Sequence, residues 1–295
     1  MAGAGSSWAI KNQAEAIATD YGFTALPVCP KGIAEKADIA LQALPPHVVS
    51  CSGRLIRVGD AFGIMYATYV ESEGFQRFSI AHELGHYFIP GHPEAVLVNG
   101  SHESNAGFTS TSRYEREADT FAAALLMPED LFRKAMGARD LSLEALMELA
   151  NLCVTSLTST AFRWVELSKR QCGVVMTDGA TIVTAYFSEA MKGALSPPYL
   201  KGQPVSPGTI THGFVSERDR IAQGDHAEGM ASCSDWFAKP QSVVLREQVI
   251  GLGDYGRTLT LLVPNQPIED DYDIYDEAEK EESLIESWTP KFYKK

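Results

Sequence analysis

Paired cysteines, a long apolar run and clustered positive charge are all missing from this sequence. Its five cysteines are scattered singly and form no CxxC pair, so we expect neither a disulfide framework nor a cysteine zinc site. The chain has no uninterrupted run of about 18 apolar residues, and its first residues lack a cationic stretch that leads into an apolar core. These features predict a soluble cytoplasmic protein that is not associated with a membrane.

Positive charge is scarce and unclustered. Lys and Arg number 25 against 38 Asp and Glu, which gives a formal net charge of −13. Ten of the acidic residues lie between Glu269 and Glu286. Because nucleic-acid binding by counterion release requires clustered Lys and Arg, we expect no direct binding of nucleic acid. We expect residues 269–295 to form a solvated acidic tail.

The first part of the chain alternates between helical and strand patterns. A chain of 295 residues that is 45% hydrophobic can bury at least one substantial core. Helical spacing, period-2 alternation and the positions of glycine and proline define the elements. The predicted elements are a helix over 8–21, a β-hairpin over 55–69 with its second strand at 62–70, and helices over 79–89 and 113–127.

The pattern changes twice in the second part of the chain. Helical patterns over 143–150 and 155–167 flank the short turn Asn151 to Val154, which predicts a helix-turn-helix-like segment. From Cys172 onward, strand-like runs flank Asp178-Gly179 and a later glycine-rich turn, so hairpins are expected there. Residues 194–213 hold four prolines and three glycines and are expected to form an irregular loop.

The segment AHELGHYFIPGH carries the clearest chemical signal. His82 and His86 are four residues apart, so a helix places both imidazoles on one face, where they can grip a single metal ion. Neutral imidazole is a preferred zinc ligand, and three protein ligands leave one position for water. Glu83 can then take a proton from that water as the water attacks a peptide carbonyl. The pattern predicts a peptidase that binds one zinc ion per chain.

Two residues compete for the role of third metal ligand. Glu115 lies on the following helix, with Asp119 on the same face as a candidate hydrogen-bond partner of a zinc-bound histidine. Ser112 and Glu115 also match a capping box, in which the glutamate would serve only the backbone. His92 lies ten residues after His82, but the long HExxHxxGxxH pattern needs glycine where this sequence has Ile89. The motif therefore favours Glu115.

Three further side chains have predicted places around this site. His92 is expected at the rim, where it could donate a hydrogen bond to substrate or to the developing oxyanion. Glu117 lies on another face of its helix and is expected to be solvated. Tyr66 is a candidate oxyanion contact on strand 62–70, which we expect to be an exposed edge that binds an extended peptide by backbone pairing.

The sequence resembles the ImmA/IrrE family of metallo-endopeptidases. The resemblance rests on Phe62-Gly63-Ile64-Met65-Tyr66, on RFSIAHELGH over 77–86, and on ExEADxFAAxLLMP over 115–128. HExxH alone occurs widely, but its combination with the second motif about 30 residues later is specific. The resemblance implies that His82, His86 and Glu115 hold zinc and that Glu83 is the general base.

The resemblance also implies an α+β fold and a protein substrate. We expect a zincin-like peptidase core with a small twisted sheet and the HExxH helix, then a helix-turn-helix-like segment and a C-terminal α/β domain. The expected limits are 1–130 for the peptidase domain, 131–170 for the helical segment, 171–268 for the C-terminal domain, which is a candidate regulatory domain, and 269–295 for the acidic tail. Family members are implied to cleave DNA-binding repressors, often of the helix-turn-helix type, and so to switch on stress responses or mobile elements.

Two other functions remain open at this level. In the first, the chain is a DNA-binding regulator with a structural or silent zinc site, and the segment 143–167 is its active element. The near-equal numbers of acidic and basic residues between Glu129 and Arg170 argue against this function, because they supply few phosphate contacts. In the second, the chain is a zinc-binding sensor whose catalysis depends on a signal received by the C-terminal domain.

Overall fold

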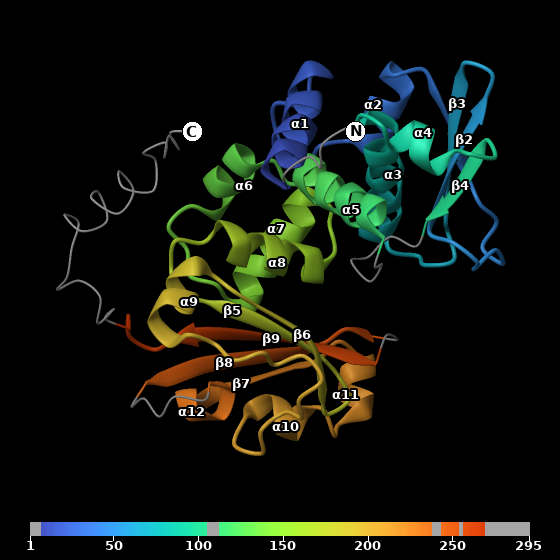
Figure 1. Cartoon of the computed structure of the whole chain (residues 1–295). Helices are drawn as coiled ribbons and strands as arrows, with labels where there is room; N and C mark the ends of the chain where they lie inside the picture. The colour runs from blue at the N-terminus through green and yellow to red at the C-terminus, as the bar shows by residue number, and fades with distance from the viewer. Residues whose placement is uncertain (1–6, 105–111, 238–242, 254–255, 269–295) are drawn as a thin grey trace, which may run out of the picture. The chain divides into compact units, whose positions relative to one another are not determined.

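The structure is a computed structural model that describes residues 7–104, 112–237, 243–253 and 256–268. It divides into two compact units, Met1–Leu167 and Ser168–Lys295 (Figure 1). Both units combine helices with a β-sheet, so the predicted α+β class is confirmed. In the part of the chain described, no helix is long and apolar enough to cross a membrane. The predicted acidic tail, 269–295, lies outside the described residues.

A four-stranded sheet organises the first unit. Its strands are β1 (Ile39–Ala43), β2 (Gly53–Val58), β3 (Ala61–Tyr66) and β4 (Ser101–Ser104), in the order β1-β3-β2-β4. The predicted hairpin is present as β2 and β3, which pair antiparallel, whereas β1 runs parallel to β3. The expectation that the second hairpin strand is an exposed edge is wrong, because β3 lies between β1 and β2. The edge next to β2 is β4.

One face of this sheet is covered by helix α3 (Glu73–Phe88), which carries the HExxH motif. Leu55 and Ile64 are paired across β2 and β3 and are fully or almost fully buried. Helix α3 begins six residues before the predicted start, because Ser72 caps its first turn by accepting a hydrogen bond from the backbone N–H of Phe75 at 3.4 Å.

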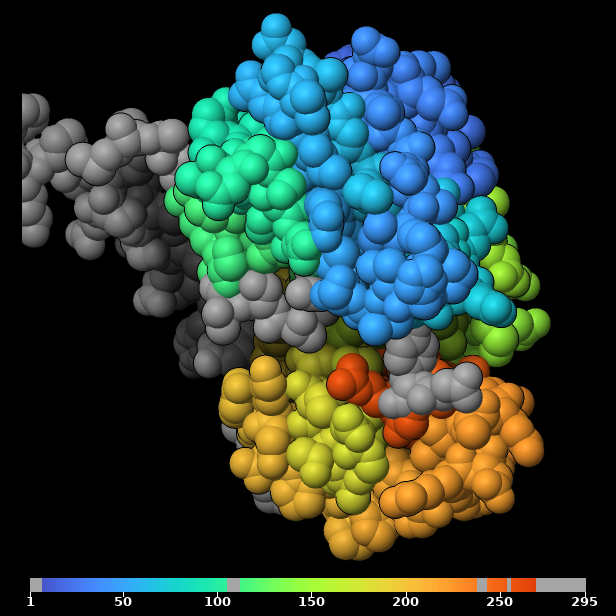
Figure 2. All heavy atoms as spheres, turned by 90° about the vertical axis from the view of Figure 1, so that its right-hand side faces the viewer, coloured from blue at the N-terminus to red at the C-terminus, as the bar shows by residue number. Residues whose placement is uncertain are grey.

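Further helices build outward from α3. Helix α5 (Arg113–Leu126) packs against α3, and α1 (Ser7–Asp20) packs against α5, which gives successive layers beside the sheet (Figure 1). The short helices α2 (Pro30–Lys36) and α4 (His92–Val96) flank α3. Figure 2 views the molecule from the sheet side of this unit, where the blue residues around β2 and β3 form much of the visible face.

The helix-turn-helix-like segment is part of this first unit. It comprises α7 (Leu143–Cys153) and α8 (Leu157–Leu167), and α6 (Glu129–Met136) precedes it. The buried guanidinium of Arg77 on α3 donates hydrogen bonds to the backbone oxygens of Cys153 and Val154, in the turn between α7 and α8. The turn is therefore anchored to the helix that carries HExxH.

Arg163, the single basic residue of α8, is also held inside the unit. It is 3% exposed and donates hydrogen bonds to the backbone oxygen of Met127 at 3.0 Å, to Glu15 at 3.1 Å and to Glu166 at 2.9 Å. Glu15 in turn accepts the backbone N–H of Glu129 at 2.9 Å. Arg163 thus joins α8 to α1 and to the end of α5.

The second unit contains a five-stranded sheet in the order β6-β5-β9-β8-β7. The strands are β5 (Gly173–Asp178), β6 (Thr181–Phe187), β7 (His226–Ser232), β8 (Val244–Gly251) and β9 (Arg257–Pro264). All neighbouring pairs are antiparallel, so this unit is α+β and the expected α/β character is wrong. Antiparallel hairpins explain the result, since a short turn joins β5 to β6, and β8 pairs with β9, the next strand along the chain.

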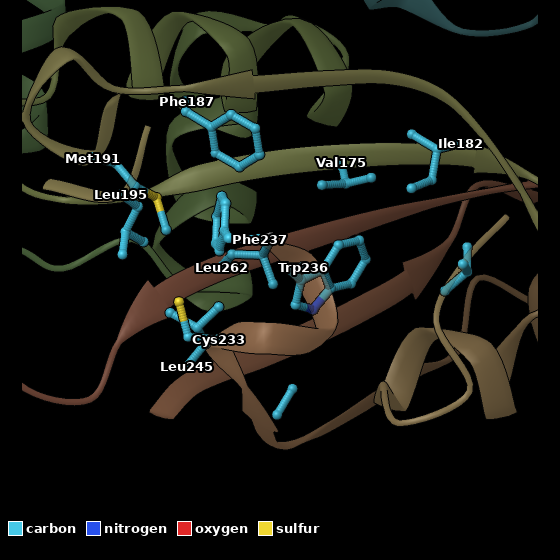
Figure 3. Packing of buried hydrophobic residues seen from close by; sticks show 12 residues of the cluster. Val175, Ile182, Phe187, Met191, Leu195, Cys233, Trp236, Phe237, Leu245 and Leu262 are labelled. Carbon is cyan, nitrogen blue, oxygen red and sulfur yellow. The ribbon is translucent and has the colours of Figure 1, made fainter. Parts of the chain in front are cut away.

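The core of this second unit lies between one face of the sheet and its helices. The helices are α9 (Glu189–Leu195), α10 (Ile210–Phe214), α11 (Arg218–Ala222) and α12 (Cys233–Trp236). Figure 3 shows Trp236, Phe237 and Phe187 packed with Val175 and Leu262 of the central strands. The buried carboxylate of Glu247 accepts hydrogen bonds from the backbone and hydroxyl of Thr211 and from the Trp236 indole, so this polar group is satisfied within the core.

We predict that Arg163→Met lowers the free energy of unfolding by about 2–4 kcal/mol, because it removes three charge-assisted hydrogen bonds from a buried position. The matched control is Arg139→Met, since Arg139 pairs with Glu148 while both side chains are about half exposed. Such a surface pair is worth about 0–1 kcal/mol. Denaturant unfolding followed by circular dichroism compares the two, and equal losses would contradict the assignment.

Candidate metal centre

The two motif histidines meet on the buried face of α3. His82 and His86 lie one helical turn apart, and both side chains are completely buried. Their Nε2 atoms are 3.1 Å apart. Both rings therefore direct the same nitrogen toward one point.

Helix α5 brings a carboxylate to that point. Glu115 Oε1 lies 3.2 Å from His86 Nε2, and Glu115 Oε2 lies 3.4 Å from His82 Nε2. Ser112 is the N-cap residue of α5, but it forms no side-chain capping bond within the described residues. The glutamate thus faces the histidines, and the alternative in which it serves a capping box is not realised.

The close approach of α3 and α5 depends on Gly85. A Cβ added at Gly85 would lie 3.1 Å from the Cα of Ala118 and 3.3 Å from the Cβ of Phe121. Such distances are tighter than ordinary van der Waals contact between carbon atoms. Glycine at position 85 therefore allows α5 to place Glu115 and Asp119 beside the histidines.

The spacing of the three side chains fits a zinc ion. Tetrahedral bonds of about 2.0–2.1 Å place ligand atoms roughly 3.3 Å from one another. The two imidazole nitrogens are 3.1 Å apart, and the nearest carboxylate oxygens lie 3.2 Å from His86 (Oε1) and 3.4 Å from His82 (Oε2), close to that spacing. Among the described residues, His82, His86 and Glu115 form a group whose donor atoms could hold one metal ion. Two imidazoles and a carboxylate are also a donor set that zinc accepts.

Asp119 orients His82. Its Oδ1 lies 2.8 Å from Nδ1 of His82, so a proton on Nδ1 leaves Nε2 as the metal-facing lone pair. Burial acts to lower the pKa of His82, but hydrogen bonds to Asp119 and Glu115 outweigh burial and raise this pKa to about 10. The carboxylates therefore favour a positive charge at this point. The pKa of His86 is lowered to about 4, chiefly by burial.

Glu83 presents a carboxylate that has no hydrogen-bond partner among the described residues. It is fully buried, and both of its oxygens are unpartnered. Burial raises the pKa of Glu83 to about 7, although the nearby His82 and the Ser104 hydroxyl act to lower it. The carboxylate lies against Gly53 of β2, where an added Cβ would come within 2.5 Å of Oε1. The fold thus keeps space for this carboxylate between the sheet and the motif helix.

His92 is buried, so the expectation of a rim residue is wrong. Its side chain is 2% exposed, and its Nδ1 lies 3.3 Å from Nδ1 of His86. Its Nε2 lies 2.9 Å from Oε2 of Glu117, whose Oε1 accepts a hydrogen bond from Arg113 at 2.8 Å. The expectation that Glu117 is simply solvated is also wrong, because its side chain is only 13% exposed and is bonded to His92 and Arg113.

His102 belongs to the same cluster and was not found from the sequence. Its Nε2 lies 2.8 Å from Oε1 of Glu115, and its ring contacts that of His86 edge-on at 4.8 Å. It sits on β4, a strand of four residues with two serines and a glutamate, which has no recognisable strand pattern. His102 is paired with the inward-facing Leu55, so the alternation of side chains along β4 also points His102 inward. This inference requires that the strand is already known.

Tyr66 lies at the end of β3. The ammonium of Lys31 sits 5.0 Å from the centre of its ring. Tyr66 is paired across the sheet with Gly53, the residue that lies against Glu83. Its contact with an oxyanion stays a prediction.

A helix that carries HExxH, joined by a carboxylate from a second helix, is the arrangement of a metal-dependent peptidase. Residues 34–164 match the family model described as the IrrE N-terminal-like domain. The predicted resemblance is thereby confirmed, and this segment belongs to the ImmA/IrrE family of metallopeptidases.

Solved structures extend the likeness in fold beyond that segment. A transcriptional regulator from Mycobacterium tuberculosis is similar with a TM-score of 0.57 and 16% sequence identity, over 86% of this chain and 75% of the other. The matched 86% of this chain is longer than the first unit, Met1–Leu167, so the similarity in fold includes part of the second unit. No curated protein matches the sequence.

We predict that Gly85→Ala loosens the contact between α3 and α5. The added methyl group meets backbone at 3.1 Å, and such overpacking costs about 1–3 kcal/mol of stability. Because the contact also sets the distance between the two ligand-bearing helices, zinc affinity should fall as well. The control is Gly63→Ala, whose added Cβ would meet its nearest neighbour at 3.6 Å. Unfolding and zinc titration check both variants, and equal behaviour would refute the role of Gly85.

Proposed function

We propose that this protein is a zinc-dependent endopeptidase in which His82, His86 and Glu115 bind one zinc ion and Glu83 is the general base. The observation that supports this function best is the convergence of two imidazole nitrogens and the Glu115 carboxylate, whose closest contacts are 3.1–3.4 Å, next to a buried carboxylate that has no partner among the described residues. A zinc-like donor spacing by itself would fit a structural site. The neighbouring Glu83 is the feature that favours catalysis.

The chemistry follows from the positions of these side chains. Zinc supplies a Lewis acid that lowers the pKa of a water ligand toward about 7 and polarises a carbonyl oxygen. Glu83 accepts the proton of the attacking water and later delivers it to the departing amine. Its burial keeps competing hydrogen bonds away from the carboxylate, and Asp119 keeps the proton of His82 on Nδ1.

Strand β4 is the element that we propose to bind the substrate backbone. It is the sheet edge next to β2, and its residue His102 contacts the metal ligand Glu115. An extended peptide can add to such an edge through backbone hydrogen bonds, which bind many different sequences. The scissile bond would then lie beside Glu83, with His102 and Tyr66 as candidate contacts for the oxyanion.

We propose that the substrate is a DNA-binding transcriptional repressor of the helix-turn-helix type, so that cleavage triggers a stress or mobile-element response in the cytoplasm. The resemblance to the ImmA/IrrE family supports this substrate class. The named regulator of similar fold is consistent with a role in transcription. The proposed domain 171–268, which lies in the second unit, is then a regulatory domain. The peptidase core and the helical segment would occupy 1–130 and 131–170.

A DNA-binding regulator is the second candidate, favoured by the similarity in fold to a transcriptional regulator. Helices α7 and α8 carry three glutamates and a single basic residue, Arg163, which is buried in ion pairs. A recognition helix without an available cation makes few phosphate contacts. A salt-dependent shift of DNA by the purified protein would support this candidate against the peptidase.

We predict that Glu83→Gln keeps zinc but lowers cleavage at least about 100-fold, because the amide cannot accept the proton. Metal analysis of the purified proteins checks the first part. Proteomic comparison of cells that produce the wild type or the variant checks the second, with one protein expected to be shortened only by the wild type. Glu94→Gln, an exposed carboxylate on α4, is the control and should cleave normally. Retained cleavage by Glu83→Gln would refute the assignment of the base.

A further inference from the structure

Beyond the three ligands and Asp119, the site contains a chain of hydrogen-bonding groups that leads away from His86. It runs from Arg113 through Glu117 and His92 to His86, with separations of 2.8, 2.9 and 3.3 Å. We propose that Glu117 and His92 are positioning residues that fix the tautomer of His86 and so present its Nε2 lone pair to the metal. This inference rests on the proposed function, because it assigns a role at the same zinc site.

The direction of each hydrogen bond in this series can be worked out by starting from Arg113. The carboxylate of Glu117 can only accept, and Arg113 already donates to its Oε1. His92 must therefore donate through Nε2 to Oε2 of Glu117. A neutral imidazole with its proton on Nε2 carries a lone pair on Nδ1, so Nδ1 of His92 accepts.

His92 in turn determines which nitrogen of His86 carries the proton. Its only described contact on the Nδ1 side is Nδ1 of His92, which is an acceptor, so His86 must carry its proton on Nδ1. Nε2 of His86 is then a lone pair, and it is the atom that faces His82 and Glu115. Asp119 imposes the same tautomer on His82 directly. His82 and His86 thus both carry their proton on Nδ1, which Asp119 imposes on His82 and His92 imposes on His86.

The surroundings keep this chain of bonds in place. Gly91 has a φ of +84°, which turns the backbone after α3 so that His92 at the start of α4 folds back onto His86. The ring of Tyr114 contacts that of His92 edge-on at 5.0 Å. His92 therefore lies between α3 and α5 and links the two helices through hydrogen bonds as well as through packing.

The test measures zinc affinity by competition with a chelating dye, on full-length protein. His92→Phe keeps a ring but removes both hydrogen bonds, and removal of such an outer partner typically weakens metal binding about 10–100-fold. In His92→Gln, the amide oxygen can accept from His86 and the amide nitrogen can donate to Glu117, so affinity should return to within a few-fold of the wild type. Glu94→Ala, on the exposed side of the same helix, should bind zinc as the wild type does.

A spectroscopic measurement on the zinc-loaded wild type separates positioning from mere packing. Nitrogen chemical shifts of the histidine rings should place the protons of His86 and His82 on Nδ1 and that of His92 on Nε2. A proton on Nδ1 of His92, or wild-type zinc affinity in His92→Phe, would overturn the positioning role of Glu117 and His92 while leaving the zinc site intact. A wild-type protein that binds no zinc would instead overturn both the proposed function and this positioning role.

Discussion

The contact between α3 and α5 at Gly85 is the constraint on which the candidate metal centre depends. Neither helix holds all the candidate ligands, since α3 carries the two imidazoles and α5 carries the carboxylate of Glu115 and its neighbour Asp119. The absence of a side chain at Gly85 permits the close backbone approach that brings these groups together, since an added Cβ would lie 3.1 Å from the Cα of Ala118. Metal binding would in turn join the two helices, so folding and metal affinity are linked in this unit.

The site is also a solution to the problem of burying charge. Three carboxylates and three histidines occupy positions where desolvation is severe, and most are compensated by one another. Glu83 is the exception, since neither of its oxygens has a partner among the described residues. Unsatisfied buried groups are costly and rare, which is why such a group next to a ligand set indicates chemistry more strongly than packing.

Local sequence patterns were enough to place the central residues but not their surroundings. Spacing of four put His82 and His86 on one helical face, and the second motif identified Glu115, because both signals are carried within single helices. The contacts of His92, Glu117 and His102 arise between α4, β4 and α5, which are distant or weakly patterned in sequence. The edge strand was assigned to β3 because it precedes the motif helix. The parallel partner β1, which lacks a clear strand pattern, makes β3 an interior strand.

In the second unit, local sequence patterns likewise predicted neighbouring strands but not the pairing of distant ones. Hairpin signals such as Asp178-Gly179 predicted neighbouring strands, and β5 and β6 do pair across that turn. They could not show that β9 inserts between β5 and β8, which depends on pairing between segments more than 70 residues apart.

X-ray absorption spectroscopy of the zinc-loaded wild-type protein identifies the atoms that bind the metal. We expect two imidazole nitrogens and one carboxylate oxygen at about 2.0–2.1 Å, together with a non-protein oxygen. A sulfur shell near 2.3 Å would contradict this expectation, because no cysteine belongs to the site. A shell of three imidazoles would also contradict it, since His92 or His102 would then replace Glu115 as ligand.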